Sequence, residues 1–250
     1  MSVTNKIVIV GAGAAGLACA ISSATSGADV TLVEKTPYLG GTVAHSLVHT
    51  IGGLYDDVGD YINGGLPVQL AARLLEADSR TCKRQMGKLW VLSVDPAIYE
   101  QVIEEWIGQY PNISVLRNAS PGEIHVGGKN KDRVTHLDVI VGGDESGLNQ
   151  LPTHALVDTT GGADVVRRIA ANKFTSGDAL AGLIFQIRGV VPNAFRFPKN
   201  VAIQRAVQKA AEAGDLPNIL RKTWFDIGIH EDEIYAKASL LTHAYDETIL

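Results

Sequence analysis

The sequence predicts an α/β fold built on a parallel sheet with helices, and three consecutive segments support this prediction. Lys6–Val10 is a β-branched run that ends at a glycine, which is typical of a strand buried on both faces. Ala14–Ser26 follows as an alanine-rich helix whose small side chains allow close packing on a sheet. Gly27 closes this helix and Val30–Val33 forms the next strand, so the N-terminus predicts a βαβ unit.

The next part of the chain alternates between loop and helix. Gly40–Leu66 is dense in glycine and has no clear period, so we expect a loop with about one helical turn. Val68–Met86 has the pattern of an amphipathic helix with Leu74 on its apolar side. Pro96–Gln109 is expected as a further helix, because the preceding aspartate suits the N-cap and proline suits the first helical position.

The second half of the chain combines short strands, turns and two more helices. We expect a small β-meander before the last strand of the parallel sheet, then a strand and a helix that open a second domain. The expected strands are Ile113–Arg117, His136–Val141, Ala155–Asp158 and Leu183–Val191. The turn-rich segments are Ser120–Gly122 and Gly142–Gly147. The expected helices are Ala163–Ala170 and Val201–Ala213, and Gly214 stops the second of them.

Composition and charge exclude several classes of protein. The 250 residues are 46% hydrophobic and 20% charged, as in an ordinary globular protein, with a formal net charge of -5. Basic residues form only short pairs such as Lys83-Arg84, which we expect on solvated helix faces, so nucleic acid is not an expected partner. No apolar run has the length of a membrane span, and the two cysteines form no CxxC motif. We expect a cytoplasmic protein.

A glycine motif joins the first strand to the first helix. Gly11, Gly13 and Gly16 form a GxGxxG pattern directly after the strand. Glycines at this spacing let the chain turn sharply, let backbone N–H groups approach a pyrophosphate, and bring the helix close to the sheet. The helix begins at Ala14 and Ala15, and its N-terminal dipole and free N–H groups favour a phosphate there. The motif therefore predicts a dinucleotide site.

An acidic residue closes the second strand. Glu34 follows the motif by roughly 20 residues, the position from which a carboxylate accepts hydrogen bonds from ribose hydroxyls. The carboxylate would repel the extra phosphate of NADP. The βαβ unit with Glu34 therefore favours NAD or FAD and leaves the choice between these two open.

Two further segments resemble the glutathione-reductase-like FAD proteins. Glu34–Gly41 resembles the signature of these proteins in which an acidic residue is followed by a glycine pair. Leu156–Asp164 resembles their "DATGD" turn, which follows a late strand. The resemblance implies FAD, with the glycine-pair loop near the flavin and its linking chain and the later turn near the FAD adenosine. It adds to the expected cofactor contacts Lys35, Gly40, Gly41, Thr42, Thr160 and Gly161.

Within that superfamily, Gly40–Gly53 resembles the flavoproteins allied to succinate dehydrogenase, fumarate reductase and L-aspartate oxidase. This resemblance implies an FAD-binding domain over residues 1–180 and the start of a substrate-binding domain over residues 181–250. It also implies an oxidase or dehydrogenase that takes hydride from a small amine, amino acid or hydroxy/carboxylic acid. Because no second GxGxxG follows a strand, we expect the electrons to pass to oxygen, a quinone or another carrier.

Two histidines and two arginines are candidates for the chemistry. His45 and His49 follow the glycine pair that the resemblance places near the flavin, where a histidine can exchange a proton or anchor a carboxylate. Arg188 lies in the expected substrate segment and could clamp a carboxylate, as could Arg196. The two histidines would share a face only on a helix, and with no third ligand in sequence we expect no metal there.

The resemblance leaves part of the family pattern unmatched. The C-terminal Gly-Asp motif and helix by which relatives return to the flavin have no counterpart after Asp164. We therefore expect a second subunit, or a missing C-terminal part, to complete the flavin site. The alternatives are an NAD-binding biosynthetic protein similar to thiazole synthases, or a non-catalytic subunit that holds FAD.

Overall fold

The structure is a computed structural model that describes residues 5–129, 133–143, 148–170 and 180–243. The chain divides into two compact units. Unit 1 comprises Met1–His45 and Ala97–Phe174, and unit 2 comprises Ser46–Pro96 and Thr175–Leu250. Each unit is thus built from two separate stretches of the chain. No helix of the described residues is both long and apolar enough to span a membrane.

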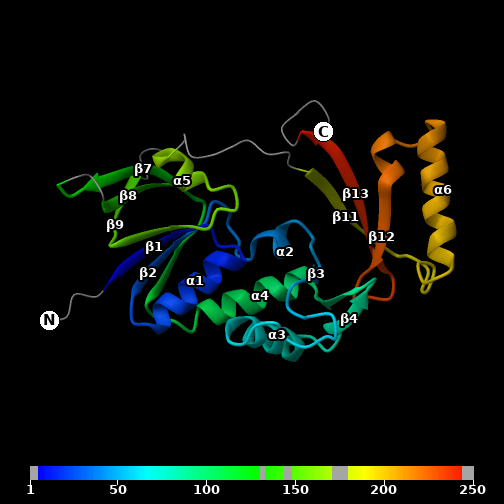
Figure 1. Cartoon of the computed structure of the whole chain (residues 1–250), viewed down its shortest axis with the longest axis horizontal. Coiled ribbons are helices and arrows are strands. Elements are labelled where there is room, and N and C mark those ends of the chain that lie inside the picture. Colours follow the sequence, from blue (N-terminus) through cyan, green and yellow to red (C-terminus); the bar gives the residue numbers. More distant parts are fainter. Residues whose placement is uncertain (1–4, 130–132, 144–147, 171–179, 244–250) are drawn as a thin grey trace. The chain divides into compact units, whose positions relative to one another are not determined.

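A parallel sheet forms the centre of unit 1 and confirms the predicted α/β class. Its strands lie in the order β10-β1-β2-β6, and every neighbouring pair is parallel. Helix α1 packs on three of these strands (Figure 1). The elements are β1 (Lys6–Val10), α1 (Ala14–Thr25), β2 (Asp29–Val33), α2 (Gly41–His45), α4 (Pro96–Ile107), β6 (Ile113–Leu116), β10 (Ala155–Asp158) and α5 (Asp164–Ile169).

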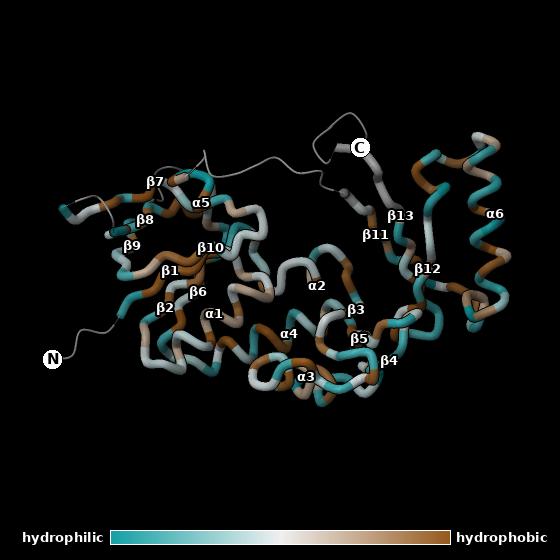
Figure 2. Tube along the Cα trace, viewed as in Figure 1, coloured by the Kyte–Doolittle hydropathy of each residue, from teal (hydrophilic) through white to brown (hydrophobic). Residues whose placement is uncertain are grey.

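Hydrophobic burial explains this sheet. Ile9 and Leu32, in the central strands β1 and β2, are both fully buried, as expected for strands covered on both faces. Figure 2 shows hydrophobic residues gathered along β1, β6 and β10. Helix α1 buries Gly16, Ala20 and Ala24 against the sheet, and such small residues allow the close approach that the sequence predicted.

The predicted β-meander is present beside the parallel sheet. Strands β7 (Ala119–Gly127), β8 (Arg133–Val141) and β9 (Leu148–Pro152) form an antiparallel sheet in that order. The prediction of a turn at Ser120–Gly122 was wrong, because these residues lie inside β7. Their proline and glycine instead accompany a break in register between Pro121 and Ile124, which is a β-bulge rather than a chain reversal.

A small antiparallel sheet in unit 2 corrects one predicted helix. The strands are β3 (Thr50–Ile51), β4 (Cys82–Met86) and β5 (Leu89–Ser93), in the order β3-β5-β4. The predicted helix Val68–Met86 is instead α3 (Leu66–Ala77) followed by β4. The helix ends because Asp78 is extended and its carboxylate binds the backbone N–H of Arg80 at 3.0 Å. A two-residue turn with Gly87 at positive φ then joins β4 to β5.

A larger antiparallel sheet completes unit 2. Its strands lie in the order β11-β13-β12. The elements are β11 (Leu180–Arg188), α6 (Lys199–Ala213), a 3-10 turn (Asn218–Lys222), β12 (Thr223–Ile227) and β13 (Glu233–His243). Helix α6 packs against β12 and ends at Gly214 with a φ of +85°, as the sequence predicted. The predicted strand Leu183–Val191 ends earlier, at Arg188, because Gly189 has a φ of +75°.

Candidate functional site

The glycine loop after β1 has no room for side chains. Gly11 has a φ of +103°, and a Cβ there would collide with the backbone of Thr159. A Cβ on Gly16 would collide with the Gly11 carbonyl group. The Gly11 N–H donates to the Val33 carbonyl oxygen at 2.8 Å, which ties the turn to the end of β2. The backbone conformation that the motif predicted is therefore fixed by contacts on several sides.

The N-terminus of α1 is open to a ligand. Gly13 is the N-cap and provides no side-chain hydrogen bond, and Ala14 and Ala15 are exposed. The first N–H groups of a helix have no intrahelical acceptor, so here they are available to an anion. Gly41 lies against this end, since a Cβ on it would be 2.9 Å from the Gly13 Cα. The two predicted glycine loops therefore meet at the start of α1.

Glu34 anchors the same loop. It follows β2 directly and is 9% exposed. One carboxylate oxygen accepts from the Ala12 N–H at 2.7 Å, and the other accepts from the N–H and hydroxyl of Thr36 at 2.9 and 3.0 Å. A carboxylate has about four acceptor directions, so one is left for a further donor such as a ribose hydroxyl. The Gly40 N–H donates to the Ala12 carbonyl oxygen at 3.0 Å and holds the second loop beside the first.

The turn after β10 supports the glycine loop. The Thr159 hydroxyl donates to the carbonyl oxygens of Val10 and Gly11, both at 2.8 Å. Sequence reasoning singled out Thr160 and Gly161 and missed Thr159, whose role depends on β10 lying beside β1. Gly161 is exposed with a φ of +80°. The Thr160 hydroxyl donates to Asp158 at 2.7 Å, so it helps to hold the turn itself.

Asp158 organises this turn electrostatically. Its carboxylate accepts hydrogen bonds from the N–H groups of Thr160, Val165 and Val166 at 2.9–3.0 Å. Burial raises the pKa of Asp158, but the hydrogen bonds from Val166, Thr160 and Val165 outweigh it, so the pKa lies below its usual value. The carboxylate therefore stays ionised and holds the turn at the end of the sheet.

The other residues predicted in unit 1 lie at its surface. Lys35 and Thr42 are exposed. His45 is the last residue of α2 and is also exposed. Its Nε2 lies 3.2 Å from the Leu39 carbonyl oxygen, and its ring is 5.4 Å from that of Tyr38. Because α2 ends at His45, His49 is not on the same helix, and the shared face that a histidine metal pair would need is not formed.

His49 is fully buried in unit 2. Its ring stacks on Tyr235 with centroids 3.6 Å apart and planes 13° apart. Its Nε2 is 3.3 Å from the Asp226 carboxylate, but neither ring nitrogen makes a hydrogen bond with any described residue. Buried polar atoms are normally paired, and exceptions are frequent where a ligand or water binds. His49 is therefore a buried group with unused hydrogen-bonding capacity.

Charged side chains surround the same carboxylate. Asp226 is 2.9 Å from Arg84 Nη2 and 3.2 Å from Lys237 Nζ. Burial raises the pKa of Asp226, but His49, Arg84 and Lys237 outweigh it, so its pKa lies well below the usual range. The prediction that Lys83-Arg84 lies on a solvated helix face was wrong, because β4 points Arg84 at the buried carboxylate. We call His49, Arg84, Asp226 and Lys237 the polar cluster.

Arg188 is the last residue of β11, in the same sheet as Asp226 and Lys237, but it is not part of the polar cluster. Its side chain is 66% exposed and its Nε is 3.5 Å from Glu233. Gln186 donates to Glu233 at 2.7 Å and to the Tyr235 hydroxyl at 3.0 Å. Burial and the nearby Glu233 raise the pKa of Tyr235, so the phenol stays protonated. Sequence reasoning thus identified β11, the strand that carries Arg188, but it missed Arg84 on β4, because Cys82–Met86 was expected to be part of a helix.

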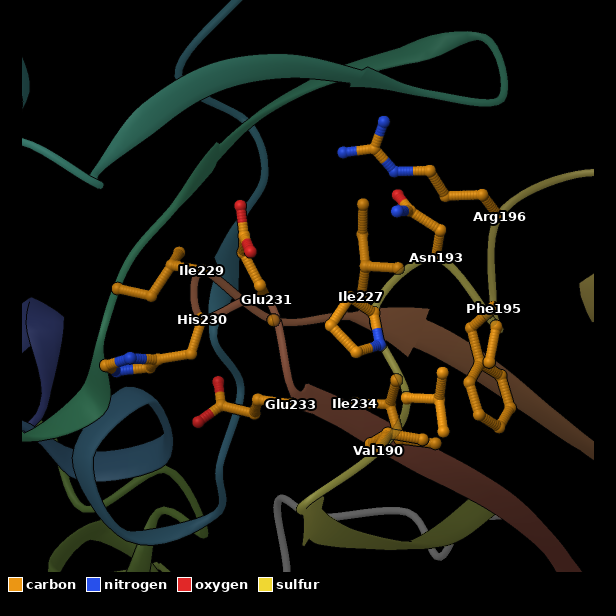
Figure 3. A pocket seen from close by; sticks show the side chains of 14 residues that line it. Val190, Asn193, Phe195, Arg196, Ile227, Ile229, His230, Glu231, Glu233 and Ile234 are labelled. Atoms are coloured by element: carbon orange, nitrogen blue, oxygen red, sulfur yellow. The ribbon is translucent and has the colours of Figure 1, made fainter.

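A cavity of about 140 Å³ lies between the turn after β11 and the β12–β13 turn. Figure 3 shows Arg196 and Asn193 extending to one side of it and His230 lying on the other. The volume is below the roughly 300–1,000 Å³ of most small-molecule sites. We assign no ligand to it, so the carboxylate contact expected for Arg196 stays a prediction.

Comparisons with known proteins agree with this geometry. A family model described as FAD dependent oxidoreductase matches residues 6–237. No curated protein matches the chain in sequence. Solved structures with the same fold include the Diels-Alderase PyrE3 (TM-score 0.58, 16% identity, 94% of this chain and 46% of that chain). A second is CtdE in complex with FAD (TM-score 0.56, 17% identity, 98% of this chain and 61% of that chain). A third is the aromatic hydroxylase CabE (TM-score 0.53, 16% identity, 94% of this chain and 44% of that chain). The chain therefore spans 44% to 61% of CabE, PyrE3 and CtdE.

Proposed function

The chain belongs to the FAD-dependent oxidoreductase family, and from this we propose that it oxidises a small amine, amino acid or hydroxy/carboxylic acid. FAD is its cofactor and supplies the hydride acceptor when bound. The proposed substrates are those expected from the resemblance of Gly40–Gly53 to the L-aspartate oxidase and fumarate reductase flavoproteins. The neighbours' structures support the fold alone, so the substrate class is argued from the side chains of this chain.

The residues of unit 1 fit the adenosine diphosphate part of FAD. A side chain on Gly11 or Gly16 would fill the loop, and the N-terminus of α1 is exposed. We propose that the N–H groups at Gly13, Ala14 and Ala15 bind the pyrophosphate, because they combine free donors with the positive end of the helix dipole. We propose that the acceptor capacity left on Glu34 receives a ribose hydroxyl.

The charge balance of the polar cluster carries the proposal for the substrate class. Arg84 and Lys237 share a single carboxylate, Asp226, so this largely buried cluster has one positive charge in excess. An unneutralised charge is costly away from water, and a ligand carboxylate would neutralise it. Arginine is also the side chain that best matches a carboxylate. We therefore propose that the substrate carries a carboxylate and binds at Arg84.

His49 is the proposed proton acceptor. Oxidation of a C–H bond beside a hydroxyl or amine would need bound FAD as the acceptor of the hydride and its electron pair, and it would release the O–H or N–H proton. A neutral imidazole can take that proton, and the negative Asp226 at 3.3 Å would stabilise the resulting cation. Bound FAD would then be reoxidised by oxygen, a quinone or another acceptor. This role would explain why both nitrogens of a buried ring lack a partner in the described residues.

The direct test is anaerobic reduction of the FAD-loaded protein, prepared with any protein that copurifies. The panel contains amino acids, 2-hydroxy acids and amines, each acid paired with its analogue that lacks the carboxylate. We expect one acid class to bleach the flavin absorbance and its analogue to fail. His49→Ala should slow the reduction by roughly 100-fold or more, within the usual range for a lost general base. His230→Ala in the same unit is the matched control. Equal rates with and without the carboxylate would contradict the proposed substrate class.

A second candidate function is hydroxylation of an aromatic substrate. It is favoured by the fold shared with CabE, which is described as an aromatic hydroxylase. A hydroxylase would be reduced by NADH or NADPH and would consume oxygen together with a phenolic substrate. Flavin bleaching by a nicotinamide, with no response to the acid panel, would replace our proposal with this one. Mass spectrometry of the released ligand tests the thiazole-synthase-like alternative, which requires an adduct derived from ADP-ribose in place of FAD.

A further inference from the structure

We propose that Glu123, His125 and Asp138 form a binding site for a divalent transition-metal ion on the β-meander of unit 1. One possible ligand atom from each side chain lies within 4.8 Å of the other two. This group is separate from the polar cluster and from the residues assigned to FAD. The proposal rests on three features of the strands β7 and β8.

A β-bulge brings the three side chains together. Pro121 pairs with Val139 and Ile124 pairs with Leu137, so Gly122 and Glu123 together face the single residue Asp138. Bulges of this kind redirect a side chain and often occur beside functional sites. His125 pairs with His136 on β8, and residues two apart in a strand share a face, so His136 and Asp138 point the same way. The bulge thus adds Glu123 to a face that already carries His125 and Asp138.

Asp138 has unused bonding capacity in a buried position. It is 6% exposed, and its Oδ2 lies 2.8 Å from His125 Nε2. Its Oδ1 is buried and has no hydrogen-bond partner in the part of the chain that the structure describes. Leaving a buried carboxylate oxygen unpaired is costly, so such an atom calls for a bound water or cation. With Glu123 and a histidine beside it, a cation satisfies both carboxylates at once.

The surrounding groups leave the site with an excess of negative charge. Glu123 and Asp138 are two carboxylates that lie beside one histidine, His125. The His136 ring stacks on His125 with centroids 4.2 Å apart, which fixes the orientation of the imidazole. Arg168 donates to the Gly122 carbonyl oxygen at 3.0 Å, at the bulge itself. A bound divalent ion would neutralise both carboxylates.

The ligand set indicates the class of metal. One imidazole and two carboxylates suit Zn²⁺ and other first-row divalent ions, whereas Ca²⁺ and Mg²⁺ favour oxygen ligands alone. Zinc ligands lie about 2.0–2.2 Å from the ion, so the three ligand atoms would have to approach one another slightly. The ion would cross-link β7 and β8 at the bulge, so we infer a structural role in the meander.

The test uses FAD-loaded protein freed of metal by a chelator and titrated with Zn²⁺ by calorimetry, with metal content measured by elemental analysis. We expect one ion per chain, with affinity that falls as pH decreases because the metal must displace the His125 proton. Asp138→Asn and His125→Ala should each weaken binding at least about tenfold. His154→Ala removes an exposed histidine of the same unit and should leave the affinity unchanged.

The flavin spectrum of each variant verifies that unit 1 is folded, because the FAD-binding residues belong to the same unit. Asp138→Asn keeps the shape of the side chain and so guards against a simple loss of folding. Absence of Zn²⁺ binding to the wild-type protein would overturn the proposal. Equal affinity in the wild-type protein and in both folded variants would overturn it as well, since the ion would then be bound elsewhere.

Discussion

Units 1 and 2 hold their candidate ligands by different means. In unit 1 the cradle is made of backbone, and its shape depends on Gly11 and Gly16 having no side chain. In unit 2 the polar cluster is made of charged side chains that gather around Asp226. Unit 1 should therefore be sensitive to added volume, and unit 2 to removed charge and to pH. The comparison would be wrong if unit 1 responded mainly to removed charge and unit 2 mainly to added volume.

The largest effect should follow removal of the shared carboxylate. Asp226→Ala leaves Arg84 and Lys237 unpaired in a largely buried place. Breaking a buried ion pair in this way costs about 3–5 kcal/mol. We expect the free energy of unfolding to fall by that amount in denaturant titrations. A loss below about 1 kcal/mol would show that the cluster is solvated and does not behave as a buried charge network.

Protonation should reproduce part of this loss. The pKa of Asp226 is lower in the folded chain than the value of about 3.9 expected when unfolded. Its stabilising contribution is therefore complete above the unfolded pKa and is lost as the pH falls through the folded pKa. Asp226→Asn should flatten the acid side of the stability profile, measured as the free energy of unfolding between roughly pH 6 and pH 2. An unchanged acid slope would contradict the assignment.

The next largest effect should come from adding a side chain to the glycine loop of unit 1. Gly11→Ala combines a φ of +103° with a collision against the Thr159 backbone. We expect FAD affinity to fall about 100-fold, which corresponds to the roughly 3 kcal/mol at the upper end for a strained backbone. Gly27→Ala is the matched control, because Gly27 also has a positive φ but has open space around it. Similar FAD affinities in the two variants would contradict the steric explanation.

A smaller effect is expected at Glu34, the proposed ribose contact. Glu34→Gln keeps the size of the side chain but weakens a charge-assisted hydrogen bond, which contributes about 1.5–3 kcal/mol. FAD affinity, measured by quenching of flavin fluorescence, should fall roughly 10- to 100-fold. The loop contact between Ala12 and Glu34 can persist through the amide oxygen, so stability should change less than affinity. If stability changed more than FAD affinity, Glu34 would stabilise the glycine loop without contacting FAD.

The smallest effect should come from Arg188→Ala. Its side chain is 66% exposed and lies 3.5 Å from Glu233, and exposed ion pairs contribute about 0–1 kcal/mol. We expect little change in stability and in KM for the proposed carboxylate substrate, whereas Arg84→Ala should raise KM at least about tenfold. If Arg188→Ala alone raised KM, the carboxylate site would lie at the arginine that the sequence singled out.

The difference between the units also explains what could be predicted from the sequence. The glycine motif, the closing Glu34 and the strands of the parallel sheet depend on local spacing, which one sequence contains. The contact between Arg84 and Asp226 joins residues 142 positions apart, and no local pattern predicts it. The helix predicted over Val68–Met86 concealed it further, because Arg84 faces its partner only when Cys82–Met86 is a strand.

Competition between nucleotide fragments tests the central claim of a backbone cradle for the adenosine diphosphate part of FAD. FAD is titrated into the flavin-free protein in the presence of excess ADP or excess FMN, and bound FAD is measured by fluorescence. We predict that ADP displaces FAD and that FMN does not, because the proposed contacts of unit 1 are with the pyrophosphate and the adenosine ribose. Displacement by FMN but not by ADP would contradict the assignment of Gly11, Gly13 and Glu34.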